Sequence, residues 1–171
     1  MWIQNSWDSY LDESVKNYLE DADLVFGNLE TPISKSWPVP MVWDDYPAYN
    51  SYPELITSFR KKNLSNIFSG LSLANNHSQD KRDWGMRETL EFLNHEGVEA
   101  LGVRAESRKR SYTLFEKNGA KIGVYAATWG SNDMSRMKRS DYHINFIPGI
   151  APLNTNLMAQ NDEAFFALQQ M

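Results

Sequence analysis

The spacing of apolar residues along the chain predicts four amphipathic helices. Apolar positions recur every three or four residues in four stretches, at residues 8–21, 53–62, 84–95 and 160–171. Ser6 or Asp8 is placed to cap the first helix, while Ser51 and Asp83 are placed to cap the second and third. Gly97 follows the third stretch and is expected to end that helix.

Short apolar runs between these stretches predict strands. The runs at residues 23–27, 66–74 and 98–103 suit buried strands. Residues 112–115 and 121–128 are expected to pair as a hairpin, because Asn118-Gly119 lies between them and Asn-Gly favours a tight turn. Helices that alternate with strands predict an α/β fold with a mostly parallel sheet and helices packed on its faces.

Residues 32–53 are expected to form a long surface loop. Proline recurs throughout this segment, which excludes a regular helix or a central strand. Trp37, Trp43, Tyr46 and Tyr49 lie between the prolines. Loops of this length are often functional, so the segment is expected to form a rim or a lid. The polar residues 130–141 are also expected to form a loop.

The composition argues against nucleic-acid binding, cysteine chemistry and a membrane span. The net charge is −5, and the basic residues form only short clusters at residues 104–110 and 136–139, so no nucleic-acid partner is expected. The absence of cysteine excludes disulfides and thiolate chemistry. No apolar run approaches the roughly 18 residues of a membrane span. The first residues lack the basic and apolar segments of a secretory signal, so any anchor is expected outside this chain.

Polar residues follow two of the predicted strands, at Asn28-Leu29-Glu30 and at Asn75-Asn76-His77. Ligands of parallel sheets bind beyond the carboxyl ends of the strands, so both motifs are placed at a candidate site. Amide and carboxylate oxygens can ligate a hard cation, and an imidazole can ligate it or donate a proton. The alternative is that both motifs are polar turns with a structural role. His95 and His143 are expected to be a helix-end residue and a loop residue, and Asp44-Asp45 a solvated pair.

These motifs carry a family resemblance. Residues 22–33 read Ala-Asp-Leu-Val-Phe-Gly-Asn-Leu-Glu-Thr-Pro-Ile, and residues 71–80 read Leu-Ser-Leu-Ala-Asn-Asn-His-Ser-Gln-Asp. Together with residues 85–90, 97–102 and 118–128, they resemble the bacterial capsule synthesis family CapA/PgsA, over about residues 22–150. That family acts in poly-γ-glutamate biosynthesis and has a calcineurin-like metallophosphoesterase fold.

The resemblance implies a role for each motif residue. Glu30 would ligate a divalent metal, with Asn28 and Asn76 as further ligands; the metal would be Mn, Fe, Zn or Mg. His77 would protonate the leaving group or stabilise the phosphoryl transition state, and Asp80 would orient His77. The family pattern also has an earlier Gly-Asp and later histidine motifs. Residues 1–171 are therefore expected to form one such domain without its first strand and its last metal motifs.

The resemblance leaves three functions open. The chain could be a metal-dependent phosphoesterase, or a non-catalytic component of a polymer synthesis or export machine. A third possibility is a carbohydrate- or peptide-binding module that uses the loop from Trp37 to Tyr52. Expected partners are a phosphoester or poly-γ-glutamate substrate, which a basic patch including Arg104 could contact, and a membrane-bound synthase. A cell-envelope location is expected from the family, and an unpaired sheet edge makes a homo-oligomer a further expectation.

Overall fold

A three-stranded parallel sheet forms the centre of the computed structural model, which describes residues 11–39, 48–105, 111–132 and 139–147. Its strands are β1 (Phe26–Asn28), β2 (Gly70–Ser72) and β3 (Glu99–Leu101), in the order β1-β2-β3. Both pairings are parallel. The predicted α/β class with a parallel sheet is therefore confirmed. Each strand is shorter than predicted, and β1 lies at an edge of this sheet, so that Phe26 is partly exposed rather than buried.

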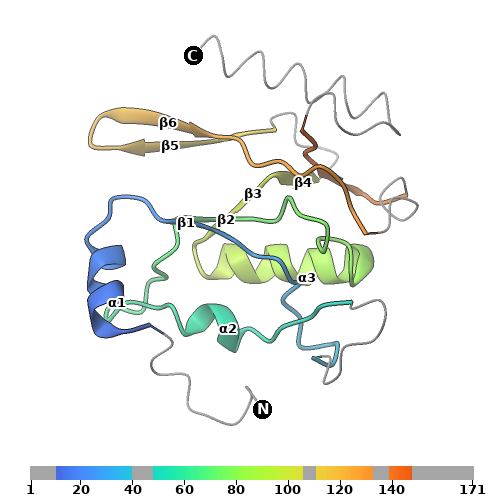
Figure 1. Ribbon diagram of the computed structural model, residues 1–171, viewed down its shortest axis with the longest axis horizontal. Coiled ribbons are helices and arrows are strands. Elements are labelled where there is room, and N and C mark those ends of the chain that lie inside the picture. The colour runs from blue at the N-terminus through green and yellow to red at the C-terminus, as the bar shows by residue number, and fades with distance from the viewer. Residues whose placement is uncertain (1–10, 40–47, 106–110, 133–138, 148–171) are drawn as a thin grey trace.

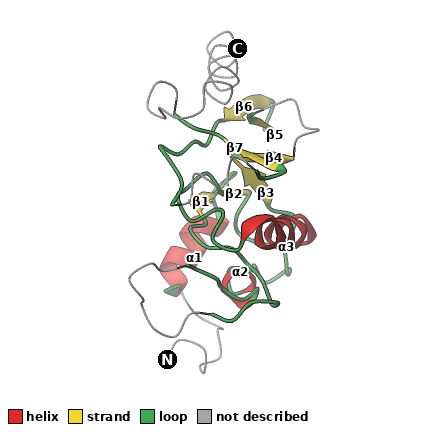
Figure 2. Ribbon diagram, turned by 90° about the vertical axis from the view of Figure 1, so that its right-hand side faces the viewer, coloured by secondary structure: helices red, strands yellow, loops and turns green. Residues whose placement is uncertain are grey.

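Three helices lie on one side of this sheet. They are α1 (Glu13–Glu20), α2 (Glu54–Thr57) and α3 (Arg82–His95), and Figures 1 and 2 place all three below the sheet. The sequence predicts helices packed on the faces of the sheet, and the three helices that the structure describes lie on one of these faces. The predicted helix at residues 160–171 lies outside the described residues. Among the helices that the structure describes, none has the length and apolar character needed to cross a membrane.

The strands β4 to β7 lie on the other side of the sheet (Figures 1 and 2). β4 (Val103–Ala105) pairs antiparallel with β7 (Tyr142–Ile144), and β5 (Thr113–Lys117) pairs antiparallel with β6 (Ala120–Val124). The β5–β6 hairpin turns at Asn118-Gly119, where φ is 51° and 78°, as the Asn-Gly pair predicts.

The predicted strand at residues 98–103 is divided at Gly102. This residue has a φ of +76°, a conformation that glycine adopts without steric cost. A Cβ there would lie 2.5 Å from Ala74 Cβ and 2.7 Å from Ala126 O. The chain therefore leaves the parallel sheet after Leu101 and pairs with β7 from Val103 onward.

Two helix starts differ from the prediction. α1 is capped by Asp12, whose side chain accepts a hydrogen bond from Ser14 N at 2.9 Å, rather than by Ser6 or Asp8, which lie outside the described residues. Asp83 does not cap α3, because the helix begins at Arg82 and Asp83 lies inside its first turn; its carboxylate accepts a hydrogen bond from Asp141 N at 3.0 Å. The C-terminal end of α3 is as predicted, since Gly97 has a φ of +69°.

α2 is a single turn, although the pattern predicts a helix over residues 53–62. Ser51 does not cap it; that residue pairs with Ile33 in an isolated parallel bridge. After α2 the chain folds back, and Arg60 and Asn66 form an isolated antiparallel β-bridge. The Asn66 side chain donates to Ile56 O at 3.0 Å, which fixes this reversal. The pairing of Arg60 with Asn66, six residues further along, therefore overrides the local helical pattern.

The core lies between the sheet and α3. Leu71 from β2 and Met86 and Leu93 from α3 are each no more than 2% exposed. Ile33, Leu29 and Phe146 belong to the same buried cluster. The core thus fixes both the segment after β1 and the segment after β2, which carry the candidate site.

Candidate functional site at the carboxyl ends of β1 and β2

The first polar motif begins at the end of β1. Asn28 is paired in register with Ser72, and Leu29 N donates to Ser72 O at 2.9 Å. Leu29 is buried, while Asn28 and Glu30 are exposed, as the alternation of side chains along a strand predicts. Asn28 Nδ2 donates to Glu30 Oε2 at 3.2 Å. The two proposed ligands therefore lie together at the carboxyl edge of the sheet.

Asn75 joins this motif to the second one. Its buried side chain donates to Leu29 O at 2.9 Å and to Asn28 Oδ1 at 3.2 Å. Its Oδ1 accepts a hydrogen bond from His77 N at 3.1 Å. The ends of β1 and β2 therefore meet, as predicted, through the side chain of Asn75, for which no separate role was predicted.

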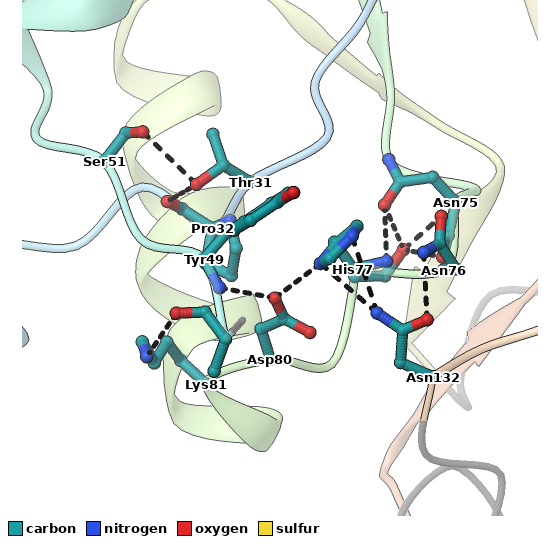
Figure 3. Close-up of polar contacts among 12 residues, drawn as sticks. Thr31, Pro32, Tyr49, Ser51, Asn75, Asn76, His77, Asp80, Lys81 and Asn132 are labelled. Atoms are coloured by element: carbon teal, nitrogen blue, oxygen red, sulfur yellow. Dashed lines mark hydrogen bonds and ion pairs between the residues drawn. The ribbon is translucent and has the colours of Figure 1, made fainter. Parts of the chain in front are cut away.

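His77 and Asp80 form a buried pair in the turn after β2 (Figure 3). His77 Nδ1 lies 2.7 Å from Asp80 Oδ2, and the two side chains are 8% and 4% exposed. An ionised carboxylate only accepts hydrogen bonds, so Nδ1 carries the proton that faces Asp80. Nε2 is then the ring atom left for other chemistry, and its orientation is fixed by the carboxylate.

Asn132 is a member of the site that the sequence did not indicate. It follows β6, in a segment predicted only to be a polar loop. Its N–H donates to Asn76 O at 3.0 Å, and its Oδ1 accepts from Asn76 Nδ2 at 2.9 Å. Its Nδ2 lies 3.3 Å from Nδ1 and 3.5 Å from Nε2 of His77. Asn76 thus contacts Asn132, and an exposed amide lies beside the imidazole. Only the short polar run Gly130-Ser131-Asn132 could have suggested it.

Tyr49, from the proline-rich segment, also reaches the site. Its ring stacks on the His77 ring with centroids 3.8 Å apart and planes inclined by 12°. Its main-chain N–H donates to Asp80 Oδ2 at 2.6 Å. Tyr49 therefore lies against the His77–Asp80 pair, and a role of the segment as a rim or lid stays a prediction; residues 40–47, including Trp43 and Asp44-Asp45, lie outside the described residues.

Three further residues with predicted positions lie away from the site. Arg104, expected in a solvated basic cluster, is buried, and its guanidinium donates to Asn145 Oδ1 at 2.6 Å. Burial lowers the pKa of Arg104 from its usual range. His143, expected in a loop, lies in β7 opposite Arg104. His95 lies in the last turn of α3, as predicted.

The donor atoms at the site fit one hard cation in part. Asn28, Glu30 and Asn76 offer amide and carboxylate oxygens, which Mg²⁺-like ions prefer, and such an ion keeps several waters beside one or two carboxylates. Within the described residues, no three His, Cys, Asp or Glu side chains lie together as a metal-binding group. Asn28 bonds to Glu30, whereas the Asn76 amide bonds to Asn132, so these side chains would supply at most part of the coordination shell of one ion and are too few for a pair of ions.

Comparison with known proteins agrees with the sequence motifs. The family model described as bacterial capsule synthesis protein PGA_cap matches residues 3–160. A comparison with curated proteins found no match. The family match covers most of the chain and includes both strand-end motifs, the Tyr49 segment and Asn132. The chain therefore belongs to the family of bacterial capsule synthesis proteins.

Proposed function

We propose that this capsule synthesis protein hydrolyses a phosphoester bond at the carboxyl ends of β1 and β2, with His77 as the proton donor. The observation that carries the proposal is the Asn75 side chain, which bonds to Asn28 Oδ1 and to the main-chain N–H of His77, the residue whose imidazole forms a buried pair with Asp80. A polar turn with a structural role alone needs no imidazole held by a buried carboxylate beside exposed oxygen donors.

Each residue has a distinct task in this reaction. Asp80 holds the proton on Nδ1 of His77, so Nε2 can deliver a second proton to the departing oxygen. Asn132 places its amide nitrogen 3.3 Å from Nδ1 and 3.5 Å from Nε2 of His77, where it can donate to an oxygen of a substrate bound at the imidazole.

A divalent ion would complete the chemistry. Asn28, Glu30 and Asn76 would hold it, and when bound it would polarise a phosphoryl oxygen and acidify a water molecule. Mn, Fe, Zn and Mg are the candidates that the resemblance offers. Oxygen donors favour Mg or Mn over a softer ion.

The wider setting follows from the family and is proposed on that basis. The substrate would be a phosphoester or a derivative of poly-γ-glutamate, and the protein would work beside a membrane-bound synthase in the cell envelope. The acidic net charge opposes binding of a polyanion by the surface as a whole. The burial of Arg104 also removes it from the basic patch that was expected to contact such a polymer.

The test compares His77→Gln with His95→Gln. Hydrolysis of p-nitrophenyl phosphate is measured with Mn²⁺ or Mg²⁺ present. Loss of a general acid lowers kcat by about 100-fold or more, so His77→Gln is expected to lose activity to that extent. His95→Gln removes an imidazole that is 79% exposed at a helix end, and its activity is expected to equal that of the wild type.

Binding of Mn²⁺ is measured by calorimetry on the wild type and on Glu30→Gln, and the variant is expected to bind more weakly. Equal kcat values for the wild type and His77→Gln would show that His77 is not the acid. A wild type without activity above the metal-only background would leave the non-catalytic role in capsule synthesis as the better explanation.

A further inference from the structure

We infer that Tyr49 is a positioning residue of this site, holding the His77 imidazole in the orientation that presents Nε2; this inference rests on the proposed function. Tyr49 lies 28 positions before His77 in the chain, in the proline-rich segment. It contacts both members of the His77–Asp80 pair, once through its ring and once through its main chain (Figure 3).

The ring contact restrains the imidazole by its face. The two rings are nearly parallel and their centroids are 3.8 Å apart, so rotation of the imidazole about its bond to Cβ would drive it into the phenol ring. Hydrogen bonds to an imidazole lie in the plane of its ring. A ring stacked on the face therefore leaves the Nε2 edge uncovered by Tyr49.

The main-chain contact restrains the carboxylate. Asp80 Oδ2 accepts from Tyr49 N at 2.6 Å and lies 2.7 Å from His77 Nδ1, so a single oxygen serves both partners. This oxygen is thereby fixed at the position where it holds the proton on Nδ1. Supporting hydrogen bonds of this kind determine which nitrogen of a histidine is available for chemistry.

Tyr49 is itself held by its neighbours on both sides. Ala48 O accepts from Lys81 Nζ at 3.2 Å. The side chain of Asn50 is buried and donates to Ser34 O at 3.1 Å and to Trp37 O at 2.8 Å. These anchors tie the segment to the start of α3 and to the residues after β1. The phenol ring therefore rests on a supported backbone, which is what a positioning residue requires.

The experiment compares Tyr49→Leu with Tyr49→Phe. Phenylalanine keeps the stacked ring, whereas leucine removes the aromatic face and both variants keep the main-chain N–H. Carbethoxylation of each histidine by diethylpyrocarbonate is followed by peptide mass spectrometry in the native protein. His95 serves as an internal reference in the same chain, because its side chain is 79% exposed.

Tyr49→Leu is expected to increase the carbethoxylation rate of His77 severalfold and to leave that of His95 unchanged, while Tyr49→Phe behaves as the wild type. In the phosphoesterase assay, Tyr49→Leu is expected to lower kcat by about tenfold with little change in KM, because a small misplacement of the acid slows the chemical step. Tyr49→Phe is expected to retain kcat.

An unchanged His77 reaction rate in a folded Tyr49→Leu variant would overturn the inference. So would a loss of kcat in Tyr49→Phe equal to that in Tyr49→Leu. If no form of the protein hydrolyses the substrate but His77 reacts faster only in Tyr49→Leu, the proposed reaction fails while the positioning of His77 by Tyr49 is supported. The two failures are therefore distinguishable.

Discussion

Replacement of Asn75 by alanine tests whether the two strand ends depend on one side chain. Asn75 is 7% exposed, and its amide donates to Leu29 O at 2.9 Å and accepts from His77 N at 3.1 Å. Alanine keeps the backbone and removes both contacts. It also removes the bond to Asn28 Oδ1, whose side chain is exposed and can bind water instead.

The magnitude follows from the two buried groups that lose their partner. Leu29 and His77 are 5% and 6% exposed, so water has little access to them in the native packing. A buried polar group without a partner costs about 1–3 kcal/mol. Two such groups, with some relief from water that enters the space left by the amide, give a loss of about 2–4 kcal/mol in the free energy of unfolding.

Urea denaturation followed by tryptophan fluorescence and far-UV circular dichroism measures this loss. Asn76→Ala is the matched control, since it removes an amide one position further along that is more exposed and bonds to Asn132. Its cost is expected to stay below about 1 kcal/mol. The reasoning is refuted if Asn75→Ala lies within about 0.5 kcal/mol of the wild type at an unchanged m-value, or if the two variants are equal.

Two further predictions concern stability. Gly102→Ala is expected to lower the free energy of unfolding, measured by urea denaturation, by about 2–4 kcal/mol, since the new Cβ would lie 2.5 Å from Ala74 Cβ in a left-handed backbone conformation. Gly119→Ala has the same left-handed conformation but lies in open space, so its expected loss is about 1 kcal/mol. Equal losses in the two variants would contradict the steric argument. The hydrogen bond from Arg60 holds the pKa of Glu96 below its usual range. The ionised Glu96 therefore stabilises the folded protein fully above the pKa of an unfolded carboxyl, and this stabilisation is lost as pH falls through the lowered pKa of the folded state. The unfolding free energy of the wild type is therefore expected to fall more steeply than that of Glu96→Gln between about pH 7 and about pH 3, and parallel curves would contradict it.

Features that depend on adjacent residues were predictable from the sequence. The Asn118-Gly119 turn and the end of α3 at Gly97 are set by residues that adopt a positive φ at low cost. The inward Leu29 between two outward polar side chains follows from the two-residue repeat of a strand. The meeting of the two strand-end motifs follows from parallel strands whose carboxyl ends share one edge.

Features that depend on distant pairing were not predictable. α2 is short although its local pattern is helical: the chain reverses between Arg60 and Asn66, and the Arg60 side chain is held by Glu96, 36 residues further along. Likewise, α3 begins at Arg82, so that Asp83 lies inside its first turn, and the Asp83 carboxylate bonds to Asp141 N, 58 residues further along the chain. Local propensities amount to a few tenths of a kcal/mol per residue, and a tertiary contact can exceed them.

The sequence by itself determined the α/β class, the parallel sheet and the two polar motifs, because the apolar repeat and the chemistry of each residue are local properties. Only the tertiary structure decided that Tyr49 would cover the imidazole and that Asn132 would lie beside it, 55 residues from His77. Neither segment carries a local signal for that contact. Their positions depend on how the proline-rich segment and the end of β6 pack against the sheet, and packing of that kind is a property of the whole fold.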